Sequence, residues 1–110
     1  MFSTIKIIYI AGPITSSSEP DNNRAAFESA KCELEQSFHV IDPWINYGGG
    51  RPDAQTPPQA VFMRASFHQL LQCHAIYMLP GWTRSDNCKA ELAVAQCLGL
   101  EVTYHPNAER

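Results

Sequence analysis

The chain has 110 residues, a formal net charge of −3 at pH 7 and 45% hydrophobic residues. This length predicts a single domain, residues 1–110, with an apolar fraction large enough for a core. No apolar run approaches the roughly 20 residues that a membrane-spanning helix needs, and no basic patch indicates binding to a nucleic-acid polymer. We therefore expect a globular domain whose partners include neither a membrane nor a nucleic-acid polymer.

The N-terminal segment MFSTIKIIYIAG has a short apolar core without a basic start, which favours a first strand over a signal peptide. The four cysteines, Cys32, Cys73, Cys88 and Cys97, form no CxxC pair. This pattern is typical of small buried residues in a reducing cytoplasm. Cys73, His74 and Cys88 lack the usual ligand spacing of a zinc site. We expect a cytoplasmic protein without a metal ion.

The segment Thr4–Ile10 is rich in β-branched residues and predicts a strand that Gly12 and Pro13 end. The loop that follows is rich in hydroxyl and amide groups, which belong to Ser16, Ser17, Ser18, Asn22 and Asn23. A strand, a glycine, such a loop and a helix are how α/β proteins build anion pockets. A solvated loop explains the same residues equally well. The glycine patterns of dinucleotide-binding folds and P-loops are absent.

Helical periodicity predicts a helix from Arg24 to about Gln36, and a strand follows over Phe38–Ile41. Trp44–Pro58 is a loop with three consecutive glycines, and a loop this long in so small a domain is typical of a lid or a partner surface. Trp44 and Tyr47 suit stacking on a base, and they equally suit the edge of the core. Gln59–Gln72 predicts the second helix.

The segment from Cys73 to Leu98 predicts a buried strand, a turn and a helix. Ala75–Leu79 is an apolar run that Pro80-Gly81 ends. Helix caps are offered by Ser85, Asp86 and Asn87. The apolar stripe that we expect on the helix consists of Ala90, Ala93, Val94, Cys97 and Leu98. Leu100–Tyr104 predicts a last strand.

Alternating strands and helices predict an α/β fold with helices on both faces of a parallel sheet. We expect a small flavodoxin- or Rossmann-like three-layer sandwich with about four strands. Ligands bind such sheets at the carboxyl ends of strands, where the strand order reverses. This topology predicts one crevice that contains Tyr9, Gly12, Ser85 and Glu91.

Glu91 is a candidate functional carboxylate near the start of the last predicted helix. The helix dipole favours its ionised form, by about 0.3–1 kcal/mol for an exposed group. A capping box does not explain it, because that motif needs Ser or Thr at position 88, which is Cys88. A salt bridge to Lys89 or Arg84 remains an alternative.

Several short motifs, in order, cover nearly the whole chain. They are Tyr9-Ile-Ala-Gly-Pro13, Asn23-Arg24-x-x-Phe27, Ile41-Asp-Pro43, Met78-Leu-Pro-Gly-Trp82, Ser85-x5-Glu91 and Ala95-x-x-Leu-Gly99. Together they resemble the nucleoside 2-deoxyribosyltransferase-like superfamily. The branch they resemble most is a small one from phages and bacteria, a domain of unknown function similar to DUF4406.

The resemblance implies an enzyme that breaks or exchanges the N-glycosidic bond of nucleosides or nucleoside monophosphates. It implies Glu91 as the nucleophile, Tyr9 beside it and Ser85 near a phosphate. A covalent glycosyl-enzyme then forms and is released to water or to another base. The substrate-binding residues that we expect are Gly12, Pro13, Ser16, Ser17, Ser18, Asn23, Trp44, Ser66, Trp82 and Ser85. It also implies a homo-oligomer, a dimer or larger, and neither cofactor nor metal.

Two positions depart from the pattern of the superfamily. Ser66 and His74 stand where relatives often have aspartate. Loss of a general acid typically costs about 10²–10⁴ in rate. Asp86, His68 and His74 are the spare titratable groups; we place Asp86 in the catalytic set and interpret His74 as structural.

The resemblance favours a deoxynucleoside 5′-monophosphate N-glycosidase over a nucleoside deoxyribosyltransferase, because Ser85 matches the hydroxyl that the monophosphate-specific relatives use near the phosphate. We expect it in the cytoplasm of a bacterium or of a phage-infected cell. The replaced aspartate leaves a second hypothesis, a non-catalytic module that binds or sequesters a nucleotide. A third is a small interaction domain with a vestigial site.

Overall fold

The computed structural model describes residues 5–14, 20–46 and 59–110. Ser16, Ser17, Ser18 and Tyr47 lie outside the described residues. The strands are β1 (Ile7–Ala11), β2 (His39–Ile41), β3 (Ala75–Met78) and β4 (Glu101–Tyr104). The α-helices are α1 (Pro20–Leu34), α2 (Gln59–Leu70) and α3 (Asp86–Cys97), and the 3₁₀ helices are η1 (Pro43–Asn46) and η3 (Trp82–Arg84). No helix in the described ranges is both long and apolar enough to cross a membrane.

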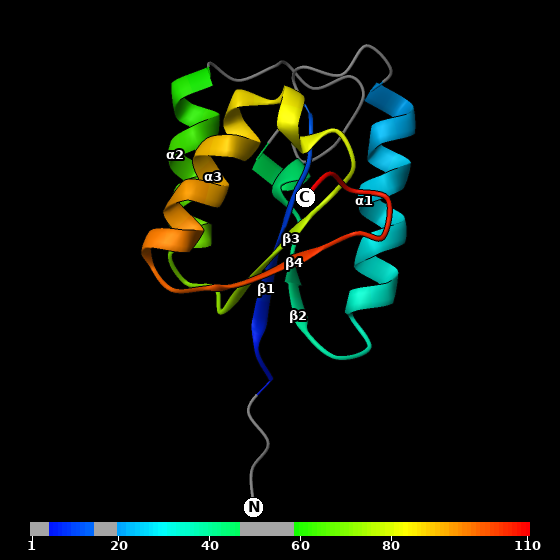
Figure 1. Ribbon diagram of the computed structural model, residues 1–110, viewed down its shortest axis with the longest axis horizontal. Coiled ribbons are helices and arrows are strands. Elements are labelled where there is room, and N and C mark those ends of the chain that lie inside the picture. Colours follow the sequence, from blue (N-terminus) through cyan, green and yellow to red (C-terminus); the bar gives the residue numbers. More distant parts are fainter. Residues whose placement is uncertain (1–4, 15–19, 47–58) are drawn as a thin grey trace, which may run out of the picture.

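The strands form one parallel sheet in the order β2-β1-β3-β4. Helix α1 covers one face, and α2 and α3 lie side by side on the other (Figure 1). This is the predicted α/β three-layer sandwich with four parallel strands, so the fold class is confirmed. The chain leaves β1 toward β2 on one side and returns to β3 on the other. The strand order therefore reverses beside β1, where such sheets place their ligand sites.

Alternating side chains of β1 serve the two faces of the sheet. Ile8 and Ile10 belong to the core on one face, with Phe27 of α1. Tyr9 belongs to the core on the other face, with Leu92 of α3. The sequence alternation of β1 thus directs the hydroxyl-bearing Tyr9 toward α3.

Helix α1 begins earlier than the sequence pattern indicated. Its first residue is Pro20, whereas helical periodicity predicted a start at Arg24. Proline fits the first position of a helix because its missing N–H would have no partner there and its φ angle is already helical.

The predicted apolar stripe of α3 was wrong. Its buried residues are Cys88, Glu91, Leu92 and Ala95. Most of the expected stripe faces outward: Ala90, Ala93 and Cys97 are exposed, and Leu98 just after the helix is 46% exposed. Val94 alone of this set packs, partly buried, against the core. The expected stripe and the buried residues both have helical spacing. A search for apolar residues alone passes over the buried set, because that set contains the carboxylate of Glu91. Glu91 lies on the buried side of α3 because its carboxylate accepts a hydrogen bond from the hydroxyl of Tyr9 in β1.

Candidate functional site

Glu91 and Tyr9 form a buried pair between α3 and the sheet. Tyr9, at the centre of β1, has no exposed surface, and Glu91 is only 4% exposed. The Tyr9 hydroxyl donates a hydrogen bond to Oε2 of Glu91. Strand β1 and helix α3 therefore fix the orientation of this carboxyl group.

Burial is the largest influence on the pKa of both Glu91 and Tyr9. It raises the pKa of Glu91 from 4.5 to about 7, and the hydrogen bond from Tyr9 acts in the opposite direction. Burial, together with the neighbouring Glu91, also raises the pKa of Tyr9 well above its usual value. The expected help from the helix dipole is small because Glu91 lies in the second turn, and the dipole effect fades beyond the first. At pH 7 both forms of Glu91 are populated.

The pair opens into a small cleft that connects with solvent. Its lining residues are Tyr9, Gly12, Ile14, Pro43, Phe62, Ser85, Asn87 and Glu91. All four residues that the topology predicted to share a crevice are among them. The space that the described residues enclose measures about 10 Å³, which is room for about one water molecule.

Three loops build the cleft at the carboxyl edge of the sheet. Gly12 follows β1, Pro43 follows β2 and Ser85 follows β3. At position 12 a Cβ atom would lie 2.9 Å from Cδ1 of Leu79 and 3.0 Å from Cζ of Phe27. Only glycine therefore lets the chain after β1 pass so close to these neighbours.

Ser85 caps α3 at the edge of the cleft. It has extended backbone angles, and its Oγ accepts a hydrogen bond from the backbone N–H of Cys88 at 3.3 Å. Its side chain is 3% exposed. This cap starts the helix that carries Glu91, so the sequence expectation of a cap at positions 85–87 is confirmed for Ser85.

Ser66 lies behind the pair rather than in the cleft. It is fully buried on α2 and accepts a hydrogen bond from Nδ2 of Asn46 at 3.3 Å. The nearby Ser66 hydroxyl lowers the pKa of Tyr9. Ser66 thus lies next to the Tyr9–Glu91 pair, but it is not part of the cleft lining.

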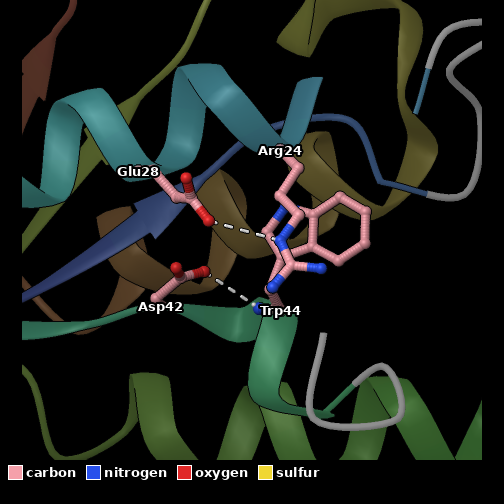
Figure 2. A network of polar contacts seen from close by, with 4 residues as sticks. All are labelled: Arg24, Glu28, Asp42 and Trp44. Atoms are coloured by element: carbon pink, nitrogen blue, oxygen red, sulfur yellow. Dashed lines mark hydrogen bonds and ion pairs between the residues drawn. The ribbon is translucent and has the colours of Figure 1, made fainter. Parts of the chain in front are cut away.

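Trp44 belongs to the core instead of a stacking surface. It is 9% exposed, and its ring meets that of Phe27 edge-on at 6.1 Å between centroids. Arg24, paired with Glu28 at 3.3 Å, lies over the indole at 6.0 Å. The Trp44 backbone N–H donates to Oδ1 of Asp42 at 3.0 Å (Figure 2). Of the two alternatives for Trp44, the structure supports the core edge.

Asp86 and Trp82 also lie away from the cleft. The Asp86 side chain is 98% exposed and pairs with Lys89 at 3.4 Å. The Trp82 indole N–H donates to the backbone carbonyl of Glu109 at 2.7 Å. Neither side chain is part of the cleft lining, so the structure does not bring Asp86 or Trp82 together with Glu91 in the cleft.

The remaining residues that the sequence singled out, His74, Pro13 and Asn23, lie outside the lining of the cleft. His74 Nδ1 accepts a hydrogen bond from the backbone N–H of Ile7 at 3.0 Å, at the amino edge of the sheet and opposite to the cleft. This agrees with the structural interpretation of His74. Pro13 packs beside Gly81. Asn23 lies in α1 and is not part of the cleft lining.

Sequence reasoning missed some of the cleft and its support. Pro43, Phe62 and Asn87 line the cleft, and Asn46 supports it through Ser66. Asn87 was interpreted only as a helix cap, although its position two residues after Ser85 was a usable signal. Within the described ranges, no three His, Cys, Asp or Glu side chains group as metal ligands would.

The fold and the cleft define a small α/β protein with one candidate site at the carboxyl edge of its sheet. The model of the family "Domain of unknown function (DUF4406)" matches residues 6–104, and the chain belongs to this family. No curated protein matches it. The crystal structure of a conserved protein from Enterococcus faecalis is similar, with a TM-score of 0.66 and 22% identity. The similarity covers 92% of this chain and 63% of that one, and it concerns the fold alone.

Proposed function

We propose that the protein cleaves or transfers the N-glycosidic bond of a nucleoside or nucleotide, with Glu91 as nucleophile. The observation that carries this proposal is the buried Glu91, which Tyr9 orients and which lines a cleft at the carboxyl edge of the sheet that connects with solvent. The resemblance of the sequence motifs to the nucleoside 2-deoxyribosyltransferase-like superfamily supports it. The proposed partner is thus a small nucleoside or nucleotide.

The first step would attach the sugar to the enzyme. A carboxylate oxygen of Glu91 attacks the anomeric carbon, the C–N bond breaks, and its electron pair leaves with the base, which takes up a proton. The transition state resembles an oxocarbenium ion, which a nearby carboxylate stabilises. Water, or a second base, then attacks the same carbon and releases the sugar or the new nucleoside, a proton and the Glu91 carboxylate.

The proton for the leaving base would come from solvent or from the substrate itself. Among the described residues that line the cleft, Glu91 is the sole carboxyl group. Retaining glycosidases usually place a second carboxyl about 5–5.5 Å from the nucleophile. We therefore expect slow turnover, or a base that leaves easily.

A deoxynucleoside 5′-monophosphate remains the favoured substrate, and hydrolysis the favoured reaction. Ser85 and the first backbone N–H groups of α3 lie at the edge of the cleft, where a helix N-terminus suits an anionic group. The proposed location is the cytoplasm, because the four free cysteines are typical of a reducing compartment. A homo-oligomer is part of the same proposal.

The test is release of free base from each nucleoside and nucleoside 5′-monophosphate, measured by chromatography. Glu91→Gln keeps the size of the side chain and a partner for Tyr9 but removes the nucleophile. We expect it to abolish release. Glu35→Gln makes the same change at an exposed residue after α1 and should retain it. Undiminished release by Glu91→Gln would exclude Glu91 as the nucleophile.

A binding module is the second candidate function, and the single carboxyl of the described cleft favours it. In that case the same nucleotides bind and are recovered intact after long incubation. Release of base by the native protein, lost in Glu91→Gln, would exclude this alternative. Absence of both binding and release would instead support an interaction domain with a vestigial site.

A further inference from the structure

Glu109, which follows β4, binds the loop between β3 and α3 (residues 79–85). Its carboxylate accepts hydrogen bonds from the backbone N–H of Gly81 at 2.9 Å and from the hydroxyl of Thr83 at 2.5 Å. Its backbone carbonyl accepts a third from the indole N–H of Trp82 at 2.7 Å. Glu109 thus contacts three consecutive residues of this loop.

The segment that carries Glu109 is itself bound to the sheet. The N–H of His105 donates to the carbonyl of Met78 in β3 at 2.9 Å, and the N–H of Ala108 donates to the carbonyl of His105 at 2.9 Å. The side chain of Ala108 is buried. Because this segment is bonded to β3, Glu109 approaches the loop from a support that belongs to the sheet.

The loop connects Glu109 to the start of α3 through printed hydrogen bonds of its own backbone. The N–H of Arg84 donates to the carbonyl of Gly81 at 3.1 Å, and the N–H of Ser85 donates to the carbonyl of Trp82 at 3.1 Å. Both acceptors belong to residues that Glu109 holds. Ser85 then caps α3 and lines the cleft. The position of Ser85 therefore depends on the same loop residues that Glu109 binds.

We propose that Glu109 is a positioning residue for the anionic group of the substrate, because it fixes the loop that places Ser85 and the first N–H groups of α3 at the edge of the cleft. The inference rests on the proposed function, since it concerns the same cleft and the favoured 5′-monophosphate. Backbone N–H groups at a helix N-terminus bind an anion when they converge on it. A loop that must first be ordered on binding costs affinity, and a loop held in advance avoids this cost.

The charge of Glu109 suits this task. Hydrogen bonds to an ionised acceptor are roughly twice as strong as neutral ones. The bonds from Gly81 and Thr83 lower the pKa of Glu109 to about 2, so the carboxylate is ionised at neutral pH. Within the described ranges Glu109 forms no ion pair, and its two carboxylate oxygens each bind one residue of the loop.

The test compares the binding of a deoxynucleoside 5′-monophosphate with that of the matching nucleoside, by isothermal titration calorimetry. All variants carry Glu91→Gln, so that the ligand is not consumed. Glu109→Ala removes both carboxylate oxygens but keeps the backbone carbonyl that binds Trp82. We expect it to weaken binding of the monophosphate about 3–10-fold and to leave that of the nucleoside unchanged. Glu109→Gln keeps one acceptor oxygen and should have a smaller effect.

Two matched controls accompany these variants. Glu35→Ala makes the same change at an exposed glutamate and should bind both ligands as the parent does. Thr83→Val removes the hydroxyl that binds Glu109, and we expect it to weaken the monophosphate alone. Thr103→Val removes a half-buried hydroxyl of β4, which bonds to the carbonyl of Ile76 at 2.9 Å, and should have no effect.

Three results would overturn the positioning role. Unchanged binding of the monophosphate in Glu109→Ala would show that the loop does not need the carboxylate. Equal weakening of monophosphate and nucleoside would show only a general loss of structure. Tighter binding would show that the carboxylate competes with the anionic group of the ligand. If Glu109→Ala does not fold, Thr83→Val decides alone.

Binding is measured separately from turnover, so this proposal and the proposed function can fail separately. Selective weakening, in a protein that releases no base, would support the positioning role and reject the glycosidase. Where base is released, Glu109→Ala in the otherwise native chain should raise KM for the monophosphate and leave kcat unchanged, because the Tyr9–Glu91 pair is intact. An unchanged KM would reject the positioning role and leave the glycosidase standing. Absence of binding of any monophosphate would reject the positioning role as well.

Discussion

At the scale of the residue, the proposed role of Glu91 and its surroundings make conflicting demands. The proposed nucleophile must be ionised, whereas burial among apolar groups favours the neutral acid. Here burial prevails and raises the pKa to about 7, so the protein keeps a poorly solvated carboxyl at some cost to its stability. Such displaced pKa values are common at functional sites, which supports a role for Glu91 beyond packing.

A pH-dependent stability follows for Glu91. Because its pKa is higher in the folded than in the unfolded chain, the folded state binds more protons between pH 4.5 and 7. Stability is therefore highest below that range, falls as the pH rises through it, and is constant above it. The linkage amounts to about 3 kcal/mol. Glu91→Gln should lack this loss when the free energy of unfolding is measured by denaturant titration from pH 4 to 8.

Comparing the stability of the native protein and of Glu91→Gln across the pH range isolates the contribution of Glu91. Other groups that titrate in this range are common to the native protein and to Glu91→Gln, so the difference between the two curves reports Glu91. Glu35→Gln should follow the native curve at every pH. Parallel curves for the native protein and Glu91→Gln would show that the buried carboxyl titrates normally.

At the scale of the element, the loop between β3 and α3 is held by the last residues of the chain. The carboxylate of Glu109 accepts hydrogen bonds from the N–H of Gly81 at 2.9 Å and from the hydroxyl of Thr83 at 2.5 Å. These bonds lower the pKa of Glu109 to about 2. Gly81 has a positive φ of 89°, a conformation that glycine adopts without strain. The loop ends at Ser85, which lines the cleft.

Glu109→Ala should loosen this loop without unfolding the sheet. We expect faster amide exchange at Gly81, measured by hydrogen–deuterium exchange with NMR detection, and unchanged exchange at Ile8 and Ile10 in β1. Because the pKa of Glu109 is lowered, the protection of Gly81 in the native protein should be present above pH 4.5 and decline as the pH falls toward 2. Glu35→Ala should have no effect, and equal exchange in both variants would mean that the Glu109 carboxylate does not hold the loop.

Helix α3 shows where sequence reasoning stops at this scale. Its existence and its cap at Ser85 could be predicted from capping chemistry and spacing. Its orientation could not, because two stripes had helical spacing and the apolar one was the exposed one. The partner that decides the orientation, Tyr9, lies 82 residues away in the sequence. Sequence patterns within a single helix do not predict a pairing between residues so far apart in the chain.

At the scale of the whole molecule, the alternation of strands and helices was sufficient to predict the parallel sheet and the edge that carries the cleft. Connection rules leave few ways to arrange four such units, and these bring Tyr9, Gly12, Ser85 and Glu91 together. The hydrogen-bond network of Asn46 and Ser66 was not predictable, since it depends on how η1 packs on α2. The exposure of Asp86 also depends on the rotation of α3.

Binding of substrate to the whole domain should appear as thermal stabilisation. A ligand that binds only the folded state adds about 2.7 kcal/mol at a concentration 100 times its Kd. We expect a deoxynucleoside 5′-monophosphate to raise the Tm of Glu91→Gln and to keep it raised over hours. In the native protein the rise should decay as the substrate is consumed. Thr103→Val should behave as the native protein does. A rise that persists unchanged in the native protein would indicate the binding module, and no rise with any nucleotide would reject both functions assigned to the cleft.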